Sequence, residues 1–230
     1  KDDLPLKVVQ LLIDDAEVQT IQDYANTVSI VRLGFNDHGP VHMRTVCRNA
    51  LKMLKIFYQA KIQTSLEKEQ SGTFADSVTA VILASFFHDF GMTVGRQDHE
   101  LYSAIIGQPI INSILKKVLP EEKDLKRRVT IYAMAMEGII GHMGTRKIHS
   151  VEAGIILVAD GCDMTKGRAR IPLSINKTPK VGDIHKYSAN AINRIGIHHG
   201  ERRPIRIDIE MSGDVGFFQI EEVLLTKIDA

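Results

Sequence analysis

The stretch SVTAVILASFFHDFG, residues 77–91, decides the fold that the sequence predicts. The run from Ser77 to Phe87 is apolar almost all round, and a helix without a polar face is buried on every side. We therefore predict a central buried helix here, which Gly91 ends. His88 and Asp89 stand at its C-terminal end, where a buried carboxylate is costly unless it is paired or coordinates a metal.

Apolar residues recur at helical spacing on both sides of this segment, up to about residue 165. Residues 61–75, rich in Gln, Ser, Glu and Lys, are the exception and predict a solvated loop or a frayed helix end. Further helices are expected after Pro40, over about His99–Leu115, from Pro120 towards Ile140, and over Val151–Asp160 with Ser150 as the N-cap. The first part of the chain is thus predicted to be a helical bundle.

The tail has a different pattern. An amphipathic helix is predicted over Ile184–Arg194, and the segment Ile205–Met211 alternates apolar and charged residues strictly, as a half-buried strand does. The stretch before that strand has a Gly-Glu break and completes a hairpin, and apolar residues from Ile220 to Ile228 return to helical spacing. The predicted fold class is mainly α, with a helical bundle over residues 1–175 and a small α+β tail over 176–230.

The composition excludes several classes of protein. With 230 residues, 44% hydrophobic and 25% charged, the chain is neither disordered nor collagen-like and fits one large domain, with or without an appendage. A net charge of +1 creates no global field that attracts polyanions, and no Trp is present to stack on bases, so a nucleic-acid partner is not expected.

Other features bear on location and assembly. No apolar run reaches the ~18 residues of a membrane helix, so no membrane partner is expected. Cys47 and Cys162 lie far apart in no metal or redox spacing, which indicates a reducing compartment, and we expect a cytoplasmic protein. A two-stranded hairpin is marginal alone, so the tail is expected to dock on the helical domain or on another copy in a homo-oligomer.

Histidines at predicted helix ends are the most informative chemical feature. His42 opens the helix after Pro40, His99 opens another, His142 ends the run MAMEGIIG, and Asp160 ends a later helix. Imidazole and carboxylate together suit divalent transition metals. Ligands contributed by several helices are how a bundle builds a metal site in its core.

The motifs HMRTV (42–46), HDFG (88–91) and the Ala-Asp closing a later helix resemble the HD-domain superfamily of metal-dependent phosphohydrolases. The matching motifs span about residues 36–170. The resemblance implies a metal-binding set of His42, His88, Asp89 and Asp160, with His99 and His142 added in members that hold two metals. The Gly-Tyr-Pro motif of the cyclic-dinucleotide phosphodiesterases is absent, which weakens any expectation of that substrate.

What the resemblance implies about activity agrees with the chemistry of such residues. We expect hydrolysis of a phosphomonoester or phosphodiester, with a nucleotide as the favoured small-molecule substrate, by a metal-bound hydroxide. The cofactor would be one or two divalent ions of Mn, Fe, Co, Ni or Zn. A metal lowers the pKa of bound water towards ~7, and a second metal can clamp the phosphoryl oxygens. Asp89 is the natural bridging ligand because its carboxylate offers two oxygens.

Further residues are candidates for catalysis or substrate binding. His88 and Asp89 are expected to be catalytic, and His38 could touch substrate or act as a general acid, or be a loop residue bonded to its own backbone. Three cations follow Asp160 closely and could bind phosphate: Lys166, Arg168 and Arg170. The alternative is that they simply belong to a solvated loop. Asp163 competes with Asp160 for the last ligand position, but beyond a glycine it is expected to cap an exposed loop.

Two other functions remain open at this point. A few di-iron oxygenases share the same kind of histidine-aspartate site, and the metal and its oxygen dependence would distinguish them. A degenerate module that senses a nucleotide without turnover is the third hypothesis, which an incomplete ligand set would support.

Overall fold

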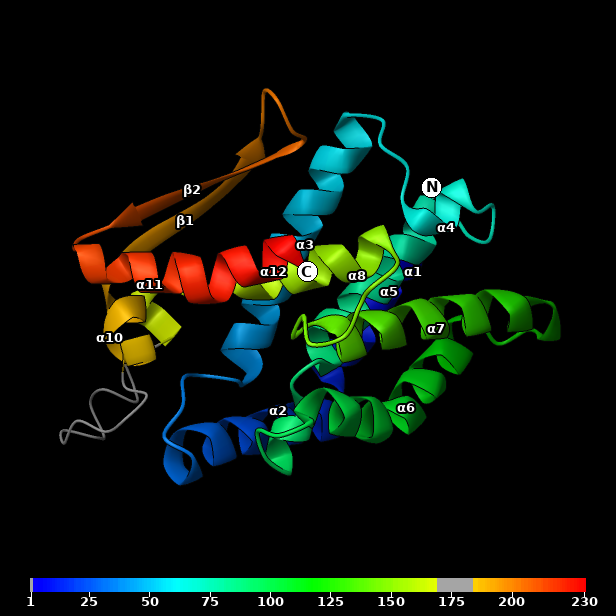
Figure 1. Ribbon diagram of the computed structural model, residues 1–230. Helices are drawn as coiled ribbons and strands as arrows, with labels where there is room; N and C mark the ends of the chain where they lie inside the picture. Colours follow the sequence, from blue (N-terminus) through cyan, green and yellow to red (C-terminus); the bar gives the residue numbers. More distant parts are fainter. Residues whose placement is uncertain (1, 169–183) are drawn as a thin grey trace.

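Helix α5 (Phe74–Phe87) is the central element of the computed structural model, which describes residues 2–168 and 184–230 (Figure 1). A capping box begins the helix: Thr73 Oγ1 accepts from the Asp76 backbone N–H, and the Asp76 carboxylate accepts from that of Thr73. Helices α1, α3, α7 and α8 pack around α5, and nearly all of its side chains are buried. The predicted central helix is confirmed, and the capping box explains why it begins at Phe74 rather than Ser77.

The remaining helical elements before the gap are α1 (Leu4–Asp14), α2 (Ala16–Thr27), the π-helical η1 (Val28–Arg32), α3 (Pro40–Gln59), α4 (Ser65–Lys68), the 3₁₀ turns η2 (Phe90–Thr93) and η3 (Glu122–Asp124), α6 (His99–Val118), α7 (Leu125–Gly141) and α8 (Val151–Gly161). The helices predicted from Pro40, His99 and Val151 begin where expected, and Ser150 Oγ accepts from the Ala153 backbone N–H as the predicted N-cap of α8. Within the segment 61–75, the short helix α4 interrupts the predicted loop.

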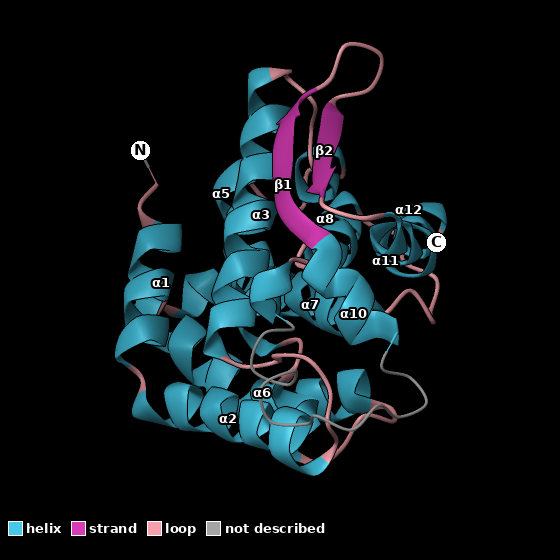
Figure 2. Ribbon diagram, turned by 90° about the vertical axis from the view of Figure 1, so that its left-hand side faces the viewer, coloured by secondary structure: helices cyan, strands magenta, loops and turns pink. Residues whose placement is uncertain are grey.

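After the gap the chain forms a helix, a hairpin and a second helical segment. These are α10 (Ile184–Ala191), β1 (Ile192–His199), β2 (Ile205–Met211), and then η4 (Asp214–Gly216), α11 (Phe217–Gln219), the π-helical η5 (Ile220–Leu225) and α12 (Thr226–Asp229). The two strands are antiparallel, with Ile197 opposite Ile207, and β1 lies against α3 (Figure 2). The segment from α11 to α12 runs alongside α8, so the C-terminus returns to the bundle (Figure 1).

The hairpin confirms the predicted strand over Ile205–Met211, whose isoleucines are half-buried and whose charged residues are exposed. The predicted helix over Ile184–Arg194 is wrong at its C-terminal end, because Ile192 pairs with Met211 and begins β1. The predicted boundary at residues 175 and 176 lies outside the described residues. Within the described part, no helix combines the length and the apolar character that a membrane crossing requires.

Candidate metal centre

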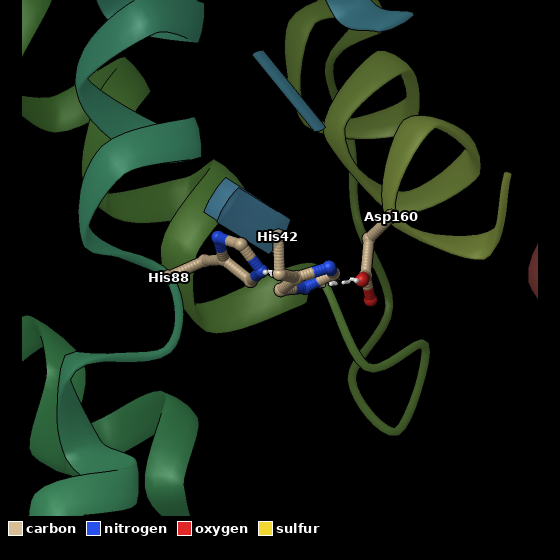
Figure 3. A group of neighbouring side chains, drawn as sticks. All are labelled: His42, His88 and Asp160. Carbon is tan, nitrogen blue, oxygen red and sulfur yellow. Dashed lines mark hydrogen bonds and ion pairs between the residues drawn. The ribbon is translucent and has the colours of Figure 1, made fainter. Parts of the chain in front are cut away.

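Helix ends bring four of the predicted ligands together. His42 lies in the first turn of α3, His88 and Asp89 directly follow α5, and Asp160 lies in the last turn of α8. All four side chains are buried. Figure 3 shows the His42 ring between His88 and Asp160. The first half of the centre, as we define it here, consists of these four residues.

The ligand atoms of this half converge on a small volume. His42 Nε2 lies 3.1 Å from His88 Nε2, 3.1 Å from Asp160 Oδ1 and 3.2 Å from Asp89 Oδ2. His88 Nε2 lies 3.3 Å from the same oxygen of Asp89. Two imidazole nitrogens and two carboxylate oxygens therefore face one another without an apolar side chain between them.

A second histidine pair faces the other oxygen of Asp89. His99 opens α6 and His142 follows α7, and their Nε2 atoms are 3.1 Å apart. Asp89 Oδ1 lies 3.2 Å from His99 Nε2 and 3.6 Å from His142 Nε2. We call His99, His142 and this oxygen the second half of the centre. Asp89 thus divides its two oxygens between two histidine pairs.

All four imidazoles are held so that Nε2 is the free nitrogen. The Nδ1 atoms of His88, His99 and His142 each donate to a backbone carbonyl, at 2.9, 2.9 and 2.7 Å. His42 Nδ1 instead lies 2.7 Å from Asp163 Oδ2. Because a carbonyl can only accept, Nδ1 carries the hydrogen in these rings and Nε2 presents a lone pair, which is the usual arrangement of a metal-ligating histidine.

The donor atoms fit a metal ion. The Nε2 lone pairs of His99 and His142 are 3.1 Å apart and repel each other unless a positive charge lies close to both. Asp89 Oδ2 and Asp160 Oδ1 are buried and both face His42 Nε2, which has at most one hydrogen to donate, so at least one of these oxygens lacks a hydrogen-bond donor in the described part of the chain. Imidazole nitrogen with carboxylate oxygen is a donor set for divalent transition metals. These buried histidine and aspartate groups could therefore hold a metal ion, and the helical fold with such a cluster fits an HD-like domain.

One curated relative is similar over nearly the whole chain. The uncharacterized protein MJ1020 of Methanocaldococcus jannaschii is 40% identical over 225 residues, which cover 98% of this chain and 84% of the relative. The chain belongs to the same family as this archaeal protein. No family model and no solved structure matches this chain. The name of this relative states no activity.

The carboxylates around His42 change its protonation. Burial and the charge of Arg168 act to lower the pKa of His42, but hydrogen bonds to Asp160, Asp163 and Asp89 outweigh them and raise it to about 10. In the metal-free protein at neutral pH, the free nitrogen of His42 therefore carries a proton. A metal at this position would compete with that proton.

Two other histidines are neutral for a physical reason. Burial dominates at His142 and lowers its pKa to about 4, although a hydrogen bond to Asp89 opposes this. At His38 burial lowers the pKa well below 6.5 against the opposing charge of Asp89. A neutral imidazole is the form that binds a metal or accepts a proton.

The carboxylates of the centre are held as anions. Burial acts to raise the pKa of Asp160, but the charge of Lys227 and a hydrogen bond to His42 keep it well below its ordinary value. At Asp89 burial is likewise outweighed by the neighbouring histidines, with His88 the largest of these contributions. Both groups are therefore in the state that ligates metal.

Gly91 makes the second half of the centre sterically possible. A Cβ at this position would lie 1.9 Å from the backbone oxygen of His99, because the start of α6 packs directly on this glycine. Ser103, one turn into α6, accepts from the Gly91 N–H at 2.7 Å and donates to the His88 carbonyl. Gly91 lies within η2 and does not end α5 as predicted, because that helix ends at Phe87, but the absence of a side chain at Gly91 lets His99 approach Asp89.

The three predicted phosphate-binding cations differ in position. Arg168 reaches the centre: its Nη2 lies 3.2 Å from His42 Nε2, and its Nε donates to the Asp37 carbonyl at 2.9 Å. Lys166 is exposed and donates to Asn193 Oδ1 at 3.3 Å, away from the histidines. Arg170 lies outside the described residues.

His38 lies beside the first half of the centre. Its ring centroid is 5.8 Å from that of His42, and its Nδ1 contacts the Asn36 carbonyl at 2.7 Å and Ser29 Oγ at 2.8 Å. The hydrogen bond to Asn36 is the local backbone contact expected of a loop residue. Because His38 is neutral, it lacks the proton that a general acid would donate, so a role as hydrogen-bond acceptor or base is the better fit.

Two residues of the centre were not predicted correctly from sequence. Asp163 was expected to be exposed, but it is buried and accepts from His42 Nδ1, because it directly follows α8, which packs against α3. Lys227 was not predicted at all: its ammonium group contacts Asp160 Oδ2. Proximity of Asp163 to a ligand was visible in the sequence, whereas nothing in the local pattern distinguishes Lys227.

A cleft of about 390 Å³ adjoins the second half of the centre. Its lining includes the ligand His99 together with Arg96, Arg146 and the acidic Asp98 and Glu100. Both arginines are exposed to solvent at this cleft. It therefore offers two cationic groups within reach of a molecule that approaches the histidines.

Proposed function

We propose that the chain is a metal-dependent phosphohydrolase of the HD superfamily, which hydrolyses a phosphomonoester or phosphodiester bond of a nucleotide. The observation that carries the proposal is the division of the Asp89 carboxylate between two histidine pairs, His42 with His88 and His99 with His142. A carboxylate shared in this way is the arrangement expected of a two-metal hydrolase.

The first half of the centre would hold one metal through His42, His88, Asp89 and Asp160. The second half would hold another through His99, His142 and Asp89. Ions such as Mn, Fe, Co, Ni or Zn suit these donors, and when bound they supply Lewis acidity and lower the pKa of water. The second half has fewer protein ligands, so it is the more open of the two.

The remaining residues would bind and orient the substrate. Arg168 is held by the Asp37 and Asp163 carbonyls through Nε and Nη1, so its Nη2, beside His42, would be the group that donates to a phosphoryl oxygen. Arg96 and Arg146 would attract a further anionic group of a nucleotide into the cleft. The neutral His38 would accept a hydrogen bond or a proton near the first half.

To test the proposal, the protein is reconstituted separately with each of these metals and its hydrolysis of phosphate esters is measured. The substrates are nucleoside mono-, di- and triphosphates, a cyclic nucleotide and a chromogenic phosphodiester, with product analysis by chromatography. We expect turnover of at least one of them, lost in D89N and retained in the exposed control variant K166A. No turnover of any substrate by metal-loaded protein would refute the proposal.

The same samples separate the two alternative functions. An iron-loaded protein that consumes oxygen and hydrolyses none of the phosphate esters would support the oxygenase hypothesis. Nucleotide binding without any product would support the sensing module. Formation of the hydrolysis product, whether phosphate or a phosphomonoester, at equal rates with and without oxygen is the result expected of the phosphohydrolase.

A further inference from the structure

Lys227, near the end of the chain, places a buried ammonium group at the centre. It belongs to α12, and only 9% of its side chain is exposed. Its Nζ contacts Asp160 Oδ2 and donates to the backbone carbonyl of His142 at 2.8 Å. A buried lysine is costly unless its charge is paired and its hydrogens are bonded; here Asp160 pairs the charge, and two of the three ammonium hydrogens have acceptors in Asp160 and the His142 carbonyl.

The two contacts join the two halves of the centre. Asp160 belongs to the half with His42, and His142 belongs to the half with His99. At Asp160 the two oxygens have separate partners: Oδ1 lies 3.1 Å from His42 Nε2, whereas Oδ2 is taken by Lys227. Only one oxygen of this carboxylate therefore faces the ligand nitrogens.

The packing around Lys227 is specific to this position. The residue after Asp160 is Gly161, where a Cβ would lie 3.2 Å from Lys227 Cδ and 3.3 Å from Leu224 Cδ1. The lysine stem thus crosses α8 directly over the glycine. Leu224, one turn earlier, is buried and anchors the same segment through apolar contacts.

We propose that Lys227 is a positioning residue of the metal centre, which holds Asp160 as a one-oxygen ligand by occupying Oδ2. This inference rests on the metal centre of the proposed function. A catalytic metal needs a coordination position that protein ligands leave open for water or substrate. By keeping Oδ2 away from the metal, Lys227 preserves such a position in the first half.

A simpler role would be an ion pair that only fastens α12 to α8. The two roles predict different effects on the metal. Loss of fastening destabilises the C-terminal segment, whether it is caused at Lys227 or at Leu224. Release of Asp160 Oδ2 instead changes the number of oxygens around the metal, and only substitution of Lys227 should cause that change.

Cobalt(II) reports this difference, because its visible absorption weakens as its coordination number rises. The variants are K227M, which keeps the length of the stem without its charge, and L224A as the control that weakens docking alone. Because K227M leaves a buried oxygen of Asp160 unpaired, D160N and the double variant D160N/K227M are measured as well. Bound cobalt, absorbance per cobalt, thermal stability and hydrolysis are recorded for each protein.

We expect K227M to bind cobalt with weaker absorbance per ion and to lose about 10- to 100-fold in activity, the usual cost of removing a group that orients a ligand. L224A should lower the Tm but keep the spectrum. In the D160N background, loaded with cobalt at saturation so that the first half is occupied, K227M should change neither the spectrum nor the activity further, since Lys227 acts through that carboxylate.

Three results would overturn the inference. The first is a K227M spectrum identical to that of the unaltered protein, and the second is a spectral change in L224A as large as that in K227M. The third is a further change in spectrum or activity when K227M is added to D160N. This comparison also tests the inference if the single variant K227M does not fold. Failure of the unaltered protein to bind cobalt is distinguishable from these, because it would refute the metal centre itself and this inference with it.

Discussion

Replacement of Asp89 by Asn tests the centre most directly, because this carboxylate alone among the described residues faces both histidine pairs. Its Oδ2 lies 3.2 Å from His42 Nε2 and its Oδ1 lies 3.2 Å from His99 Nε2. Asn has the same shape but carries no charge and presents an amide nitrogen on one side. We therefore expect D89N to weaken metal binding in both halves at once.

The size of the effect follows from how the ligands are divided. The unaltered protein should hold about two metal ions per chain, as a two-metal site does. D160N removes a ligand that faces only His42 and His88, and H142N removes one that faces only the other half, so each should keep about one ion. D89N should keep close to none after dialysis.

Elemental mass spectrometry on dialysed proteins measures these ratios. D163N is the matched control, because Asp163 orients His42 through Nδ1 and is not itself a ligand in the proposed centre. It should bind the metal of the first half about 10- to 100-fold more weakly but reach the same stoichiometry at saturation. Two ions retained in D89N, or both lost in H142N, would refute the division of the Asp89 carboxylate.

Other predictions concern pH, charge and packing. The pKa of His42 is raised to about 10, although burial and Arg168 oppose its proton. Protonation of His42 therefore stabilises the metal-free fold. This stabilisation is complete below the ordinary histidine pKa of about 6.5 and is lost as the pH rises to about 10. Calorimetry should therefore show the Tm of metal-free protein falling over that interval, and falling less in D163N; a flat profile would contradict the pKa. R168Q removes a cation 3.2 Å from His42 Nε2, so we expect tighter metal binding in chelator competition but about 100-fold slower hydrolysis. Metal affinity and hydrolysis rate that rise or fall together would contradict this role. G91A places a Cβ against the backbone of His99 and should lower the free energy of unfolding by at least about 1–3 kcal/mol in urea titration, with the second metal lost; an unchanged metal content would contradict the packing argument.

The sequence was most informative where a local pattern carries the chemistry. The apolar run before His88 predicts burial, and a histidine and an aspartate directly after such a run indicate a polar site in the core. The structure brings His88, Asp89 and Asp160 together as that pattern suggests. Helix ends are visible in sequence through Pro40 and Ser150, which is why the ligands could be placed on them.

Residues that reach the centre from elsewhere in the chain were beyond such patterns. The helical spacing near the C-terminus suggested an apolar face that includes Ile228, but Ile228 is about half exposed and its neighbour Lys227 is buried instead. The reason is tertiary, because the Asp160 carboxylate on α8 pairs with the lysine. Asp163 was misjudged for the same reason: its partner His42 lies 121 positions away.

The charges around His42 bear on which substrate the centre would accept. Asp89, Asp160 and Asp163 contact His42, whereas the cations Lys227 and Arg168 lie against Asp160, so three negative charges face two positive ones. The proton on His42 balances this sum in the metal-free protein. A divalent ion that displaces the proton leaves an excess of one positive charge, and a second ion adds to it. A metal-bound hydroxide would offset one of these charges and a phosphate ester would bring further negative charge into this buried site, whereas a neutral substrate would leave the remaining excess as buried unpaired charge, which is costly. On electrostatic grounds the loaded centre therefore favours an anionic substrate, as the phosphohydrolase proposal requires.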